Sequence, residues 1–238
     1  MKNQRDFCLL TEWVAPRVYL AGLVVLLSVA GVEARVGNST ESSFCTETKE
    51  CLLFDLVCKT SDFEVRHYSS VRWVSTDVTS HLLDIAQVTG FLRLYKYING
   101  ANVDGVKIDM TAPIIVKVEE DDSFWESTVF TINFLLPSAF QGNVSEPTDS
   151  TVYFTDMPDM KVYVRDYGGL MISITDALNR KWLAKNLKKV NASYVEEFHY
   201  AVKYDSPTQI LNRRNEVWYV VKGDPVCSDP DGTQNGAR

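Results

Sequence analysis

The chain has 238 residues, of which 45% are hydrophobic and 23% charged, values typical of a globular protein that exclude disorder throughout. Its formal net charge of −7 disfavours nucleic acid as a partner, because a nucleic-acid-binding face needs an excess of positive charge. The length fits one domain or a tight internal duplication.

The N-terminus resembles a secretory signal. The run from Val18 to Val32 contains no charged residue, follows Arg17, and leads to small residues at a candidate cleavage site after Ala34. A membrane-spanning helix needs about 20 apolar residues, so this run is short for an anchor. We therefore predict a cleaved signal peptide over residues 1–34, no stable membrane anchor and a secreted, extracellular protein; a retained anchor is the alternative.

Four cysteines follow the predicted cleavage site, and an even number favours disulfides in an oxidising compartment. Cys58 lies just before the first predicted strand and Cys227 just after the last, so we predict a Cys58–Cys227 bridge, which leaves Cys45 to pair with Cys51. Zinc binding is the competing use of these cysteines, but the chain has no Cys-x-x-Cys pair.

Three Asn-x-Ser/Thr triplets agree with a secreted chain. They predict glycosylation at Asn38, Asn143 and Asn191.

Residues 35–57 form a polar leader with two of the cysteines, and the composition of its first part predicts a mobile segment. Beyond it, alternating and β-branched residues predict strands over the sequences FEVRHY (63–68) and VRWVSTDV (71–78). Apolar side chains then recur every three or four residues from Val88 to Ile98, which predicts an amphipathic helix that ends at Asn99-Gly100. Two further strands are predicted within 106–120 and 127–137.

The second half repeats this order, with strands predicted within 151–174, 196–204 and 215–222. Between the first and second of these, Thr175 or Asp176 can cap a helix whose apolar stripe is Leu183, Leu187 and Val190. The pattern Val-Arg-any-Tyr stands at 65–68 and again at 164–167, which we interpret as the same place in each half. We therefore predict a domain over 58–227 that contains two repeats, about 62–137 and 151–222, followed by a disordered tail at 228–238. The predicted fold class is α+β: duplicated strand-helix-strand-strand units form a distorted antiparallel β-barrel flanked by two helices.

Sequence patterns typical of enzymes are mostly missing. The chain has no His-Glu-any-any-His motif, no Gly-any-Ser-any-Gly elbow and no Gly-rich phosphate loop. With the four cysteines of the mature chain paired, no free thiolate remains there as a nucleophile. We therefore expect a protein without catalytic activity.

His67 is the candidate metal-ligating residue. It shares a strand face with Phe63 and Val65, so its imidazole is expected against apolar surface. One interpretation is a partly buried histidine held by a backbone or hydroxyl partner. The other is an axial ligand offered to haem iron from an apolar wall.

Several segments, in this order, resemble the SOUL haem-binding protein family. They are FEVRHY, RWVST, GFLRLYKYINGAN, KIDMTAPI, YDSP and ILNRRNEVWYV, and they extend across 63–220. The combination of KIDMTAPI with LNRRNEVW carries the resemblance, which covers essentially the whole mature domain.

The resemblance implies non-covalent binding of haem b or another tetrapyrrole, without known catalysis. It places an axial histidine in one branch of the family at His67, whereas other members use an apolar groove with basic residues near the propionates. Arg66 and Arg72 are the candidate propionate partners because they lie close to His67 in the sequence. We predict a secreted carrier or scavenger of haem or porphyrin; the alternative is an extracellular domain that binds an unidentified protein partner instead.

Overall fold

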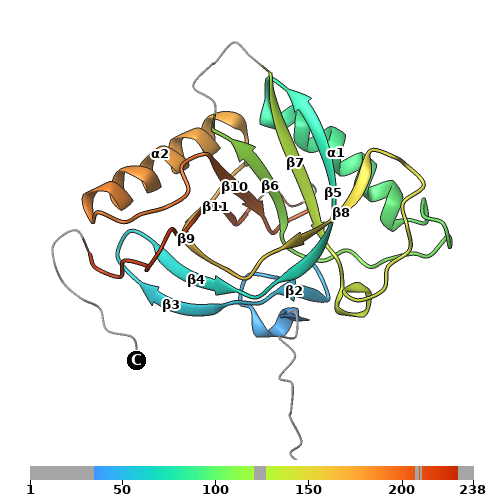
Figure 1. The fold of residues 1–238 in the computed structure, drawn as a ribbon, viewed down its shortest axis with the longest axis horizontal. Helices are drawn as coiled ribbons and strands as arrows, with labels where there is room; N and C mark the ends of the chain where they lie inside the picture. The colour runs from blue at the N-terminus through green and yellow to red at the C-terminus, as the bar shows by residue number, and fades with distance from the viewer. Residues whose placement is uncertain (1–34, 121–126, 207–208, 210, 230–238) are drawn as a thin grey trace, which may run out of the picture. The chain divides into compact units, whose positions relative to one another are not determined.

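The computed structural model describes residues 35–120, 127–206, 209 and 211–229. The predicted signal peptide and most of the predicted tail lie outside these residues. The strands and helices are β1 (Val36–Asn38), β2 (Glu50–Leu52), β3 (Asp55–Lys59), β4 (Glu64–Tyr68), β5 (Val71–Ser80), α1 (Leu83–Ile98), β6 (Ile114–Glu119), β7 (Thr128–Leu135), β8 (Val152–Met157), β9 (Met160–Tyr167), α2 (Ser173–Lys189), β10 (Phe198–Lys203) and β11 (Asn215–Val220) (Figure 1). Two short 3-10 helices, η1 (Ser39–Glu41) and η2 (Ser138–Phe140), complete the order.

Nine strands form one antiparallel sheet in the order β3-β4-β9-β11-β10-β6-β7-β5-β8. This confirms an α+β fold with a large antiparallel sheet and two helices. Strands β3 and β8 are the edges of this sheet, so a closed barrel is not found among the described strands. Leaving out β3, the strand order is symmetric between the two halves of the chain. Strands β4, β5, β6 and β7 occupy the same places counted from one edge as β8, β9, β10 and β11 do counted from the other.

The two Val-Arg-any-Tyr segments do not occupy equivalent positions, and that part of the prediction is wrong. The first lies on β4, the first strand of its half, and the second lies on β9, the second strand of its half. In the sheet these two strands are direct neighbours, with Tyr68 opposite Met160. Two strands directly precede each helix, so the order in each half is strand-strand-helix-strand-strand.

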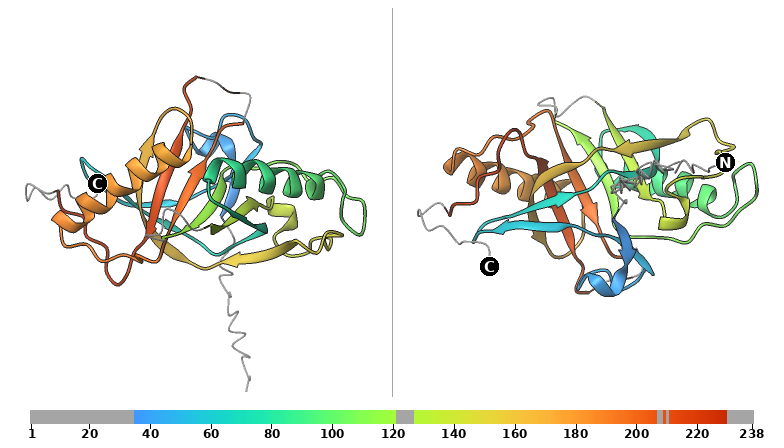
Figure 2. Two further views of the ribbon diagram at one scale, coloured as in Figure 1. Left: turned by 90° about the horizontal axis from the view of Figure 1, so that it is seen from above. Right: turned by 60° about the horizontal axis from the view of Figure 1, so that its bottom comes forward.

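Both helices lie on one side of the sheet and the N-terminal strands on the other (Figures 1 and 2). Helix α1 packs on β5, β7 and β8, and α2 packs on β9 and β11. The opposite face of the sheet curves around an inner core to which strands from both halves contribute, including Tyr68, Trp73, Ile115 and Trp218.

The polar leader is ordered, in contrast to the mobile segment that its composition predicts. Its β1 and β2 pair with each other, and Leu52 donates its N–H to the carbonyl of Ala112. The Phe44 ring packs edge-on against Tyr204, with 4.8 Å between the ring centroids. Buried aromatic and aliphatic side chains outweigh the polar composition because they cover the inner core.

One disulfide joins the two ends of the domain and a second closes a short loop in the leader. Cys45 is joined to Cys51 and Cys58 to Cys227, which are the two pairs proposed from the sequence. Beyond Cys227, Asp229 is buried and accepts hydrogen bonds from the N–H and hydroxyl of Ser61 at 2.7 Å. The structure therefore describes the first two residues of the predicted tail.

Candidate functional site

His67 lies on β4 with its imidazole between two carboxylates rather than against apolar surface. Its Nε2 is 2.9 Å from both carboxylate oxygens of Asp159, and its Nδ1 is 3.5 Å from Asp55. The side chain is 27% exposed. Strand alternation does place Phe63 and Val65 on the same face, but both are buried beneath α2, whereas His67 lies at the end of the strand beside the acidic side chains.

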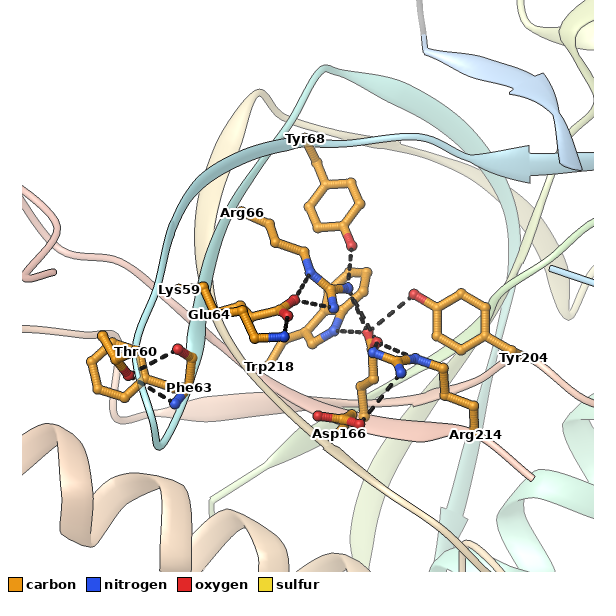
Figure 3. Close-up of polar contacts among 11 residues, drawn as sticks. Lys59, Thr60, Phe63, Glu64, Arg66, Tyr68, Asp166, Tyr204, Arg214 and Trp218 are labelled. Atoms are coloured by element: carbon orange, nitrogen blue, oxygen red, sulfur yellow. Dashed lines mark hydrogen bonds and ion pairs between the residues drawn. The ribbon is translucent and has the colours of Figure 1, made fainter. Parts of the chain in front are cut away.

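Arg66 is buried inside the domain and does not reach solvent. Its side chain is 1% exposed and pairs with Glu216, which is fully buried, and with Glu64 (Figure 3). Burial is the largest influence and opposes the charged form, but the Glu216 carboxylate together with Tyr68 and Tyr204 outweighs it, so the pKa of Arg66 lies above its ordinary value. Arg72, in contrast, pairs with Asp156 on β8 at 2.8 Å.

Glu216 is the centre of a buried polar network on the inner face of the sheet. Its carboxylate accepts hydrogen bonds from Arg66, Arg214, the Tyr204 hydroxyl and the Trp218 indole, at 2.7 to 3.1 Å (Figure 3). The family-like sequence LNRRNEVW supplies three of these five residues. We interpret this motif as structural, because every charge in the network is matched inside the domain.

An apolar groove lies between α1 and strands β6 and β10. It consists of two hollows of about 380 and 280 Å³ that share Phe91, Ile114 and Lys203 in their walls and therefore adjoin. The first hollow is completed mainly by Val88, Leu92, Val116, Ile132, Met171 and Ile172. The second is completed by Tyr95, Met110 and Thr111, the segment Tyr204–Ser206, and Glu47 and Thr48 of the Cys45–Cys51 loop. Concave, mostly apolar walls with a few polar groups are the usual form of a small-molecule site.

Lys203 lines both hollows and is the basic residue that they share. Partial burial, and to a smaller extent the nearby Arg213, lowers the pKa of Lys203 from its ordinary value of 10.5. Asp205 and Glu47 act in the opposite direction but do not offset the burial. An ammonium in this position is favourable for a ligand that carries a carboxylate.

The three haem-binding candidates proposed from the sequence, Arg66, His67 and Arg72, do not line this groove. Strand β4 and the start of β5 are separated from β6 and β10 by other strands in the sheet order. Sequence reasoning also missed Lys203, which looks like any lysine at the end of a strand. The sequence signal for the groove was the apolar stripe of α1, to which Val88, Leu92 and Tyr95 belong. In the structure these three side chains are 63%, 54% and 48% exposed, so they do not fill the core.

A second buried polar cluster lies beneath α2. His199 is 1% exposed, with Nδ1 at 2.8 Å from Glu120 and Nε2 at 2.9 Å from Asp176. Burial lowers the pKa of His199, but the two carboxylates outweigh burial and raise it to about 9. Because this imidazolium is enclosed and fully partnered, we assign it to the stability of the fold.

The described part of the chain holds no group of three or more His, Cys, Asp or Glu side chains arranged to bind a metal ion. None of its helices has the length and apolar character required to cross a membrane. The three predicted sugar acceptors, Asn38, Asn143 and Asn191, are exposed, as an acceptor must be.

These features define an α+β domain with a large antiparallel sheet, two helices on one face and an apolar groove beside the first helix. The chain belongs to the SOUL heme-binding protein family, whose model matches residues 49–220. Human heme-binding protein 2 is 36% identical over 164 residues, which cover 69% of this chain and 80% of the human protein. Heme-binding protein 1 of Xenopus laevis is 28% identical over 158 residues, which cover 66% of this chain and 83% of that protein.

The relatives are named as binding proteins rather than enzymes. Among solved structures, an EcmrR–DNA complex has a TM-score of 0.51 at 9% identity, covering 67% of this chain and 57% of the EcmrR chain. This likeness concerns the fold alone.

Proposed function

We propose that this protein is a secreted, non-catalytic carrier or scavenger of haem or a related tetrapyrrole, and that the groove between α1 and strands β6 and β10 is its binding site. The observation that carries the proposal is the apolar groove with Lys203 in its wall. Membership of a heme-binding protein family supports the ligand class. The disulfides, the predicted signal peptide and the exposed glycosylation triplets support secretion.

The residues of the groove fit such a ligand in two respects. Side chains such as Phe91, Leu92 and Ile114 supply the apolar surface that removes a macrocycle from water. Lys203 supplies a charge for a propionate, and this matters because a net charge of −7 repels an anionic ligand at longer range. Arg66 and Arg72 already pair with carboxylates elsewhere, so Lys203 replaces them in the proposal.

The proposal makes affinity dependent on pH. A propionate beside Lys203 stabilises the ammonium form, so binding is strongest while Lys203 is protonated. As pH rises through the pKa of Lys203, which lies below 10.5 in the free protein, the charge is lost and affinity falls.

Axial ligation by His67 remains a separate proposal. Its Nε2 faces Asp159, so coordination of iron requires that this contact be given up. A His67→Ala variant with unchanged affinity and absorption spectrum would remove His67 from the site.

A Soret titration of the disulfide-bonded mature protein, Arg35 onward, tests the proposal. We expect saturable one-to-one binding that Lys203→Met weakens about tenfold, the size of a partly exposed charge-assisted contact. The matched control is Lys222→Met, because Lys222 follows β11 and does not line the groove. Absence of saturable binding by the wild type would overturn the proposal, and equal losses in both lysine variants would overturn the assigned role of Lys203.

The alternative is an extracellular protein-interaction domain that retains the fold without binding haem.

The symmetric order of the strands supports a separate proposal, that the domain consists of two repeats, with β4–β7 equivalent to β8–β11.

A further inference from the structure

Exposed apolar side chains gather along α1. Ile85, Val88, Leu92 and Tyr95 are 56%, 63%, 54% and 48% exposed, and their spacing of three or four residues places them on one stripe. The face of α1 that packs on the sheet is formed by other residues, including Leu83 and Leu94.

The start of α2 adds four more exposed apolar side chains. Leu170, Ile172, Ile174 and Leu178 are 57%, 37%, 68% and 63% exposed. The two helix starts are held together, because the Asp84 carboxylate on α1 accepts hydrogen bonds from the N–H and hydroxyl of Ser173 at 3.2 and 2.9 Å.

These eight side chains account for more than half of the fifteen large apolar residues that are exposed in the described part of the chain. Val88, Leu92 and Ile172 also line the groove, so the exposed apolar surface continues to its rim. Single exposed apolar residues are ordinary, but a cluster of this kind marks an interaction surface.

Farther along α2 the same helix becomes basic. Lys181, Lys185 and Lys188 are exposed and follow Leu178 at helical spacing. None of the three forms an ion pair within the residues that the structure describes. The three lysines border a shallow hollow that also contains two acidic side chains, Glu120 and Glu196. Glu120 is already paired with Arg180.

We propose that this surface, formed by the eight exposed apolar residues of α1 and 170–178 and by the three lysines of α2, docks on an anionic lipid bilayer. Apolar side chains next to lysines are the composition of helices that lie in a membrane interface. Anionic headgroups supply the counter-charge that the lysines lack. A second copy of the chain bound face to face would present the same lysines again and supply no counter-charge. Docking turns the rim of the groove toward the bilayer, so an apolar ligand can pass between them without crossing water.

The test is co-sedimentation of the ligand-free protein with vesicles, so its outcome does not depend on haem binding. One set of vesicles contains phosphatidylcholine alone and the other a mixture with phosphatidylserine. We expect stronger binding to the mixed vesicles that declines as salt is added. Replacing Lys181, Lys185 and Lys188 with Gln should weaken binding by about fivefold per lysine, the effect of roughly 1 kcal/mol for each charge near the surface.

The apolar part is tested with Val88→Ser combined with Leu178→Ser, two exposed positions whose replacement leaves the core intact. The matched control is Leu56→Ser combined with Val129→Ser, which changes exposed residues of β3 and β7. We expect a loss of binding of at least about tenfold in the first variant and none in the control. Equal binding to both kinds of vesicle, equal losses in both variants, or a concentration-dependent dimer that Val88→Ser with Leu178→Ser abolishes would overturn the proposal.

Discussion

Stability should fall in mildly alkaline solution because of His199. The pKa of this imidazole is raised from 6.5 to about 9 by Asp176 and Glu120, against the opposing effect of burial. A group with a raised pKa in the folded state contributes stability that is complete below its unfolded pKa and lost as pH rises through its folded pKa. The difference corresponds to about 3 kcal/mol, lost between about pH 6.5 and pH 9.

Urea unfolding with the disulfides intact measures this loss, with the free energy of unfolding extrapolated at each pH. The His199→Gln variant should be less stable than the wild type at about pH 6, because the buried Asp176 carboxylate and the partly buried Glu120 carboxylate lose their shared cation, and its stability should vary less over this window. The control, His81→Ala, changes an exposed histidine and should keep the wild-type slope. A wild-type stability that is flat over this range, or the same slope in His199→Gln, would refute the reasoning.

Three further substitutions test the packing of the fold, each by urea unfolding. Glu216→Gln should cost about 3–5 kcal/mol because it leaves the buried Arg66 guanidinium and the partly buried Arg214 guanidinium without their shared carboxylate; a loss below about 1 kcal/mol would contradict the role of the network. Gly90→Ala should cost about 1–3 kcal/mol, since a Cβ there lies 2.6 Å from the Ile132 side chain; no loss would show that α1 can move off β7. Replacing both Cys58 and Cys227 with Ser opens a bridge between residues 169 positions apart and should cost about 4–5 kcal/mol; an unchanged stability would mean that the bridge does not restrict the unfolded chain.

The helices show how far a sequence pattern can be interpreted. The period of apolar residues predicted α1 correctly, and the left-handed stop lies at Gly100, whose φ is 104°. The predicted stripe, however, lies largely on the groove and solvent side, while Leu83, Ala86 and Leu94 form the buried face. Apolar residues that line a groove follow the same period as those that fill a core, so the sequence alone cannot separate them.

The candidate ligand residues show a second limit. Arg66 and His67 lie within FEVRHY and Arg72 within RWVST, but alternation along the strand and the order of the sheet place each beside a different carboxylate. Lys203 enters the groove only because β10 pairs with β6, with Lys203 opposite Ile114, and that pairing depends on contacts between distant parts of the chain.

The position of the macrocycle is the central claim, and NMR of the mature protein with labelled methyl groups tests it most directly. Adding haem should broaden or shift the methyl signals of Ile114 and Leu92, which line the groove, and leave that of Val65 beneath α2 unchanged. Changes confined to Val65 and to residues near His67 would contradict the groove and return the site to β4.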